Sequence, residues 1–272
     1  MFYTPEDRQY ILDKLLHALK GDGRIAGVLV VGSGATGFKD DYSDIDLSVV
    51  MASEADVEPV FRDWDGKIQT LFPVVTRFET HYGPYLFLYG FLLDNILELD
   101  IGFLCLNNLV ARRPQWQIAF DRSGQIQSIM EASLVDKPEA PEPDRYQQAL
   151  ESIWHYIMHS AICLRRKQNW RAVYYLDMVR QQTIELAGLR LGLETKNYRQ
   201  VDQFPADLLL SWQQSLPSDL SPGKIMRALQ TATQCFFDEA AIWERRSGGT
   251  LTDLLQSKMQ LFLESIDEEL NA

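Results

Sequence analysis

The stretch from Val28 to Val50, which reads VLVVGSGATGFKDDYSDIDLSVV, constrains the fold more than any other part of the chain. An apolar run ends at Gly32-Ser33, a polar loop follows, and a second apolar run begins with Asp44-Ile45-Asp46. Successive side chains of a strand point to opposite faces, so Asp44 and Asp46 share one face of the second predicted strand. Two neighbouring carboxylates repel each other, and partial burial strengthens the repulsion. Since Mg²⁺ prefers carboxylate oxygen, the pattern predicts a divalent cation between them.

Gly32 and Ser33 end the first predicted strand and open a short helical turn. Backbone N–H groups in such a position can bind phosphate oxygens. A phosphate site and a metal site a few residues apart indicate nucleotide chemistry.

The run GSGATG at 32–37 also matches the dinucleotide-binding pattern G-x-G-x-x-G. That fold needs a crossover of about a dozen residues, usually a helix, between two parallel strands. Residues 38–43 are too few for it and show no helical apolar period. We therefore reject a dinucleotide-binding fold.

Gly-Ser, a short loop and Asp-x-Asp at the head of a strand resemble the signature of the DNA polymerase β-type nucleotidyltransferase superfamily. That signature includes a third carboxylate on a later strand, which Asp100 in the run 97–103 matches. Within the superfamily the chain resembles bacterial antibiotic nucleotidyltransferases of the lincosamide and aminoglycoside 6-type. The likeness rests on YSDID at 42–46, on the helix around 176–180 and on a two-part layout.

The resemblance implies a transferase that moves a nucleoside monophosphate, AMP, from a nucleoside triphosphate to a hydroxyl of a small molecule. It implies two Mg²⁺ ions at Asp44, Asp46 and Asp100, with Gly32 and Ser33 on the triphosphate. Asp100 is either a ligand of the second ion or the general base. Acceptors of this kind include aminoglycoside and lincosamide antibiotics, so the resemblance also implies a role in antibiotic resistance.

Two other functions stay open. One is nucleotidylation of a protein or another macromolecule, of a regulatory or antitoxin type. The other is a nucleotide-binding module without catalysis.

The net charge of −12 argues against a general nucleic-acid binder and suits a cationic substrate. The scattered cysteines are typical of buried thiols in a reducing compartment. The N-terminus turns acidic at once, and no apolar run approaches the roughly 20 residues that span a bilayer. We expect a cytoplasmic protein without a membrane segment; the oligomeric state is left open.

Periodicity and turn residues predict an α+β protein of two domains. Residues 1–137 form the nucleotidyltransferase domain, a mixed sheet with flanking helices. Its predicted helices lie at 5–21, 56–71, 107–112 and 125–134, and its strands begin near 25 and 44 and cover 74–79, 85–93, 96–104 and 118–121. A proline-rich linker follows at 138–144. Residues 145–272 form a helical substrate-binding domain with helices at 146–167, 172–191, 206–214, 223–246 and 250–270.

Three further sets of residues have a structural and a functional interpretation. Arg180, on the same predicted helix as Tyr174, either pairs with a local acid such as Asp177 or faces the acceptor; the resemblance favours the acceptor. His155 and His159 have the spacing of a zinc pair, but the glutamate of HExxH is missing, which favours a structural role. Glu98 shares a strand face with Asp100, where we expect a solvated rim position.

Overall fold

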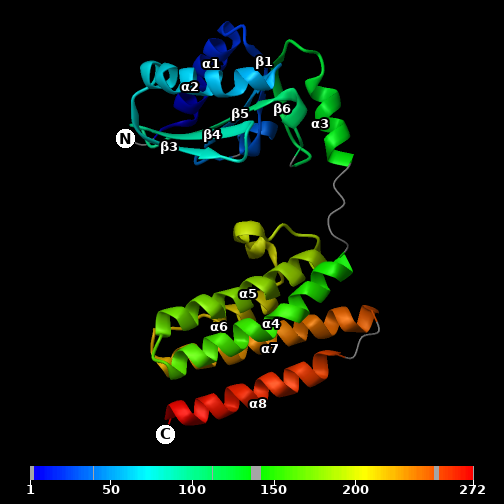
Figure 1. Cartoon of the computed structure of the whole chain (residues 1–272). Helices are drawn as coiled ribbons and strands as arrows, with labels where there is room; N and C mark the ends of the chain where they lie inside the picture. The colour runs from blue at the N-terminus through cyan, green and yellow to red at the C-terminus, as the bar shows by residue number, and fades with distance from the viewer. Residues whose placement is uncertain (1–2, 39, 112, 136–141, 248–250, 272) are drawn as a thin grey trace. The chain divides into compact units, whose positions relative to one another are not determined.

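The computed structural model describes residues 3–38, 40–111, 113–135, 142–247 and 251–271. The chain divides into two compact units, Met1–Lys137 and Pro138–Ala272 (Figure 1). Unit 1 combines a β-sheet with helices, and the described part of unit 2 is helical. The α+β class predicted from the sequence is therefore confirmed.

The sheet of unit 1 has six strands in the order β3-β4-β5-β2-β1-β6. They are β1 (Ile25–Val30), β2 (Ile45–Met51), β3 (Val74–His81), β4 (Leu86–Leu93), β5 (Glu98–Cys105) and β6 (Gln117–Asp121). The sheet is mixed, because β2 and β5 are parallel whereas β1 and β2 are antiparallel. An antiparallel β1–β2 pair is incompatible with the parallel crossover of a dinucleotide-binding fold, as the spacing of residues 38–43 predicts.

The helices of unit 1 are α1 (Pro5–Gly21), α2 (Glu54–Leu71) and α3 (Ile126–Val135), with short 3₁₀ turns η1 (Gly32–Thr36) and η2 (Leu106–Asn108). Helix α1 begins with a capping box, in which Thr4 Oγ1 accepts from the Asp7 amide and the Asp7 carboxylate accepts from the Thr4 amide. Thr4 thus caps the helix where the sequence predicts its start.

The helix predicted at 107–112 is wrong. Only the end of η2 is helical there, and Leu109 is already extended. The amide of Ala111 donates to Ser133 Oγ of α3 at 2.8 Å, so a tertiary contact replaces an intrahelical bond. Arg112 lies outside the described residues.

The two faces of the sheet are covered differently. On one face, side chains such as Leu47 and Ile101 pack in a core with α1 and α2, which lie on the same side of the sheet in Figure 1. On the other face, Val50 and Leu104 pack with α3. Asp46 belongs to this second face by the alternation of β2, but it lies near the opposite end of the strand from Val50.

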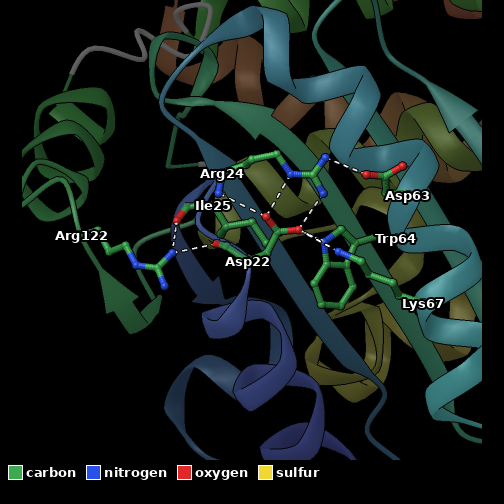
Figure 2. A network of polar contacts seen from close by, with 7 residues as sticks. All are labelled: Asp22, Arg24, Ile25, Asp63, Trp64, Lys67 and Arg122. Atoms are coloured by element: carbon green, nitrogen blue, oxygen red, sulfur yellow. Dashed lines mark hydrogen bonds and ion pairs between the residues drawn. The ribbon is translucent and has the colours of Figure 1, made fainter.

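Asp22, which follows α1, is the centre of a polar network at the N-terminal end of β1 (Figure 2). Its side chain is 8% exposed. Its carboxylate accepts from Arg24 Nε at 3.0 Å, from Lys67 Nζ at 2.9 Å and from Trp64 Nε1 at 3.1 Å. The Asp22 carbonyl accepts from Arg122 at 2.9 Å. The hydrogen bond from Arg24, then those from Lys67 and Trp64, hold the pKa of Asp22 well below its usual range.

Unit 2 is a helical bundle among the residues described, as predicted. Its helices are α4 (Glu142–Arg165), α5 (Asn169–Leu191), α6 (Ala206–Gln214), α7 (Pro222–Ser247) and α8 (Leu251–Asn271), with short turns η3 (Lys196–Tyr198) and η4 (Val201–Gln203). Helices α4, α5, α7 and α8 share a core that includes Ile157, Leu176 and Phe236. Every helix in the described ranges is too short or too polar to cross a bilayer.

The linker predicted at 138–144 is wrong at its C-terminal end. Residues 138–141 lie outside the described ranges, but α4 begins at Glu142. Proline fits the first turn of a helix, and acids there complement the helix dipole. Pro143 and Asp144, which indicate a linker by composition, are therefore equally suited to start a helix.

Candidate active site

Strand β2 places the two acids of the Asp-x-Asp motif at one end of the sheet. Asp46 is the second residue of the strand, and Asp44 immediately precedes its first residue, Ile45. Ile45 is fully buried in the core with α1 and α2, so the alternation turns Asp46 to the other face. The core of β2 therefore fixes where this carboxylate points.

Strand β5 brings the third acid beside the first two. The register of the parallel pair sets Asp46 opposite Asp100, and paired residues of neighbouring strands share a face. One carboxylate oxygen from each of Asp44, Asp46 and Asp100 lies within 4.8 Å of the other two. Among the residues that the structure describes, this is the only cluster of three or more acid, histidine or cysteine side chains spaced to bind a metal.

The electrostatics of this cluster favour an added positive charge. Burial, followed by the charges of Asp44 and Asp100, raises the pKa of Asp46 to about 7. Burial, followed by the charges of Glu98 and Asp44, raises the pKa of Asp100 to about 6. Oδ1 of Asp100 is buried and accepts no hydrogen bond from the described residues. These features fit a hard divalent cation, which would offset the repulsion among the carboxylates and coordinate the unsatisfied Asp100 oxygen.

Gly32 lies directly against the carboxylate of Asp46. Its φ is +61°, and a Cβ built there would lie 1.9 Å from Asp46 Oδ2. The backbones are also close beside Gly32, where the Val31 amide donates to the Asp46 carbonyl at 3.0 Å. Only glycine fits this approach. Ser33 follows in the same 3₁₀ turn and is exposed, so the structure brings Gly32 of the Gly-Ser pair against Asp46.

Two residues that the sequence analysis did not select complete a row with Asp46 and Asp100. The strand registers pair Asp100 with Gly90 and Gly90 with Phe78. A Cβ built on Gly90 would lie 2.2 Å from the ring of Phe78 and 3.0 Å from Asp100 Oδ1. The Phe78 ring, on a half-exposed residue, thus occupies the space above Gly90 beside the acid. A glycine inside an apolar strand run was the available signal, since it often marks close approach of another group.

Two charged residues act on the cluster from nearby. Glu98 is exposed and adds negative charge to both Asp46 and Asp100, in line with the predicted rim position. The positive charge of Arg113 opposes the rise in the pKa of Asp46. Sequence reasoning missed Arg113, because its segment, which follows η2, has no motif.

Tyr174 and Arg180 lie on α5 in unit 2, where they contact different neighbours. The guanidinium of Arg180 donates to Asp177 Oδ1 at 2.8 Å and to Ser215 Oγ at 3.1 Å. Of its two interpretations, local pairing with Asp177 is therefore realised. Tyr174 is 58% exposed and packs edge-on against Tyr175.

His155 and His159 of α4 lie in tilted and edge-on contact with each other and with aromatic rings of α4 and α5. Their ring centroids are 4.2 Å apart, and His159 lies 5.1 Å from the ring of Tyr175. Burial, followed by the charge of His155, lowers the pKa of His159. These contacts agree with the structural role favoured by the missing glutamate.

The chain is similar in structure to two solved structures of low sequence identity. No protein-family model matches the chain, and no curated protein does. An aminoglycoside 6-adenyltransferase from Bacillus subtilis is similar over 95% of this chain and 98% of its own, with 12% identity and a TM-score of 0.45. A nucleotidyltransferase-like protein from Exiguobacterium sibiricum is similar over 96% of this chain and 89% of its own, with 15% identity and a TM-score of 0.39. At TM-scores this low, the geometry of the three carboxylates is what bears on function.

Proposed function

We propose that this chain is a Mg²⁺-dependent nucleotidyltransferase that transfers AMP from ATP to a hydroxyl of a small molecule and releases pyrophosphate. The approach of Asp44, Asp46 and Asp100 within 4.8 Å of one another is the observation that carries this proposal. Three carboxylates so close are unfavourable alone, and they suit a hard cation that also binds triphosphate oxygens.

Each residue near the cluster has a defined part in this proposal. Asp44 and Asp46 hold the cation, and Gly32 and Ser33 contact the β and γ phosphates of the triphosphate. Mg²⁺, when bound, supplies the positive charge that offsets charge developing on the leaving pyrophosphate. The acceptor oxygen attacks the α-phosphorus while the bond to the bridging β-phosphate oxygen breaks.

Asp100 is assigned to the acceptor side. It would take the proton of the acceptor hydroxyl at a carboxylate oxygen, or it would help to hold a second Mg²⁺, which would supply positive charge to the acceptor hydroxyl. Its unsatisfied Oδ1 lies on the side of Gly90 and Phe78, where the partly exposed ring offers a surface to the acceptor.

The charge near this site favours a cationic acceptor. Glu98 is exposed beside Asp100, and the chain carries a net charge of −12. Aminoglycosides and lincosamides, which the motif resemblance implies, are hydroxylated and cationic. We propose Tyr174, which is exposed, as a further acceptor contact. Arg180, the other residue that the resemblance implies, pairs with Asp177 and Ser215 instead.

A protein acceptor is the second candidate, and the edge strand β3 favours it. Val75, Phe78 and, just beyond the strand, Tyr82 are each at least half exposed. An exposed edge with apolar side chains is a surface on which another polypeptide can pair.

The test uses the purified full chain with Mg-ATP or Mg-GTP and a panel of aminoglycosides and lincosamides. We expect acceptor-dependent pyrophosphate release together with a product heavier than the acceptor by one nucleoside monophosphate. Asp100→Asn should reduce turnover far more than Mg-ATP affinity. Labelled ATP in a cell extract tests the second candidate, for which the label would appear on protein.

Several outcomes would decide against these assignments. Equal losses of Mg-ATP affinity and turnover in Asp100→Asn would move Asp100 to the nucleotide side. Mg-ATP binding without transfer to any small molecule or protein would favour the non-catalytic module. Absence of both Mg-ATP binding and pyrophosphate release would overturn the proposed function.

A further inference from the structure

The loop between η1 and β2 carries Asp44, and it is fastened to the body of unit 1 by one buried arginine. Arg8 of α1 is only 3% exposed. Its NH1 donates to the Ser43 carbonyl at 3.1 Å, and its NH2 donates to the Asp40 carbonyl at 2.9 Å. Its guanidinium also lies 4.0 Å from the ring centroid of Phe38. A single side chain therefore contacts the loop at three positions, and one of them, Ser43, is adjacent to Asp44.

Further hydrogen bonds hold the same end of the loop. The Tyr3 hydroxyl donates to the Ser43 carbonyl at 3.2 Å, so this oxygen accepts from both Tyr3 and Arg8. The carboxylate of Asp40 accepts from Ser43 Oγ at 2.8 Å and from the Tyr42 amide at 2.9 Å. Ser43 is buried, and both its carbonyl and its hydroxyl are hydrogen-bonded.

Asp44 needs such restraint because its neighbours repel it. Asp44 is not a ladder residue of β2, so the sheet alone does not hold it. The negative charges of Asp46 and Asp100 act to push its carboxylate away when no cation is bound. Carboxylates that bind a cation must be held to within about half an ångström, which requires supporting contacts around them.

We propose that Arg8 is a positioning residue for the metal site, acting through the Asp40 and Ser43 carbonyls to hold Asp44 beside Asp46 and Asp100. This inference rests on the proposed function, since it presumes that the three acids bind a divalent cation. The planar guanidinium donates to two carbonyls and stacks on Phe38 at once, which an ammonium group cannot do. Arg8→Lys should therefore remove only part of the hydrogen bonding to the two carbonyls. Arg8→Met should remove all of it while keeping an apolar side chain of similar length.

Lys14→Met is the matched control, because Lys14 makes similar contacts from the same helix to a different place. Its Nζ donates to the Leu71 carbonyl at 2.8 Å and lies 5.1 Å from the ring centroid of Phe72. Both lie at the end of α2, away from the Asp44 loop. If the effect came from a general loosening of α1, Lys14→Met and Arg8→Met should both weaken Mn²⁺ binding.

The experiment titrates the full chain with Mn²⁺ alone and follows free Mn²⁺ by electron paramagnetic resonance. Circular dichroism defines a temperature at which each variant is folded. We expect Arg8→Met to weaken Mn²⁺ binding about 10-fold, as is typical of groups that orient metal ligands. Arg8→Lys should fall between Arg8→Met and the unsubstituted chain, and Lys14→Met should bind Mn²⁺ normally.

The possible failures are distinguishable. If the unsubstituted chain binds no Mn²⁺, both the proposed metal site and the role of Arg8 are wrong. If it binds Mn²⁺ and folded Arg8→Met binds equally well, only the role of Arg8 is wrong. Should Arg8→Met not fold, Arg8→Lys decides, and normal Mn²⁺ affinity in that variant overturns the inference. An equal loss in Lys14→Met would also overturn it, since the effect would then be a general consequence of loosening α1.

Discussion

Two carboxylates, one near each end of β1, lie in opposite surroundings. At the N-terminal end, Asp22 is surrounded by donors from Arg24, Trp64 and Lys67, and its pKa is held well below the usual range (Figure 2). At the other end, beyond η1, Asp46 faces two further acids, and its pKa is raised to about 7. The charged form of the same residue type is thus stabilised at one end of β1 and destabilised at the other.

This difference separates a carboxylate that stabilises the fold from carboxylates that the proposed function assigns to a cation. Asp22 finds its cations and donors within unit 1, so it contributes to stability without further help. Asp46 is instead surrounded by the charges of Asp44, Asp100 and Glu98, which outweigh that of Arg113, and Asp100 Oδ1 is buried without a hydrogen bond from the described residues. Groups whose pKa is strongly raised by burial and neighbouring charges are often found at functional sites.

The largest expected effect comes from Asp46→Asn. The amide cannot supply charge to a cation, so nucleotidyl transfer should fall by about 10³-fold or more. Without metal at neutral pH, the free energy of unfolding should instead rise by about 1–2 kcal/mol, because repulsion is relieved. Transfer assays and urea unfolding in EDTA measure the two effects. Retained activity, or a loss of stability comparable with that of an Asp22 variant, would break the comparison.

Asp22→Ala should have the reverse effects. Loss of a mostly buried acceptor leaves several donors unsatisfied, and we expect a cost of about 3 kcal/mol in the free energy of unfolding. Activity per folded molecule and Mn²⁺ affinity should not change. Lys67→Met is the milder control, since this lysine is about half exposed and one of several donors; its cost should stay below about 1 kcal/mol. A large loss of Mn²⁺ affinity in folded Asp22→Ala would show that the two ends of β1 are coupled.

The smallest effect is a difference in how stability depends on pH without metal. Asp46 and Asp100 have folded pKa values of about 7 and 6, above the unfolded value of about 3.9. Their contribution to stability is fully present below about pH 4 and is lost as the pH rises through 6 and 7. Asp22 has a lowered pKa, so its contribution is present above about pH 4 and is lost as the pH falls further.

Urea unfolding in EDTA at a series of pH values tests these signs. Compared with the unsubstituted chain, Asp46→Asn should lose less stability between pH 4 and 7, and Asp22→Ala should lose less below pH 4. Mg²⁺ at pH 8 should raise the stability of the unsubstituted chain and not that of Asp46→Asn, since a ligand stabilises only a fold that binds it. Parallel profiles for all three proteins would mean that neither carboxylate centre titrates as proposed.

Local features of this chain followed from the sequence by itself. Thr4 marks the start of α1, because a side-chain oxygen can cap the amide three residues ahead. The alternation of β2 predicts that Asp46 turns away from the core that buries Ile45, because the period of a strand is two. The short spacing at 38–43 excludes a parallel crossover between β1 and β2. At Pro143 the sequence alone was not decisive, because proline fits both a linker and the first turn of a helix.

Only the tertiary structure decided which distant residues meet. The row from Asp46 through Asp100 and Gly90 to Phe78 depends on the order and register of four strands. Likewise, the donors around Asp22 and the contacts of Arg8 with the Asp44 loop join elements far apart in the chain. Periodicity states which face a side chain occupies but not which strand or helix lies beside it. That choice is made by the packing of all the elements together, because the free energy of burial depends on area and not on sequence distance.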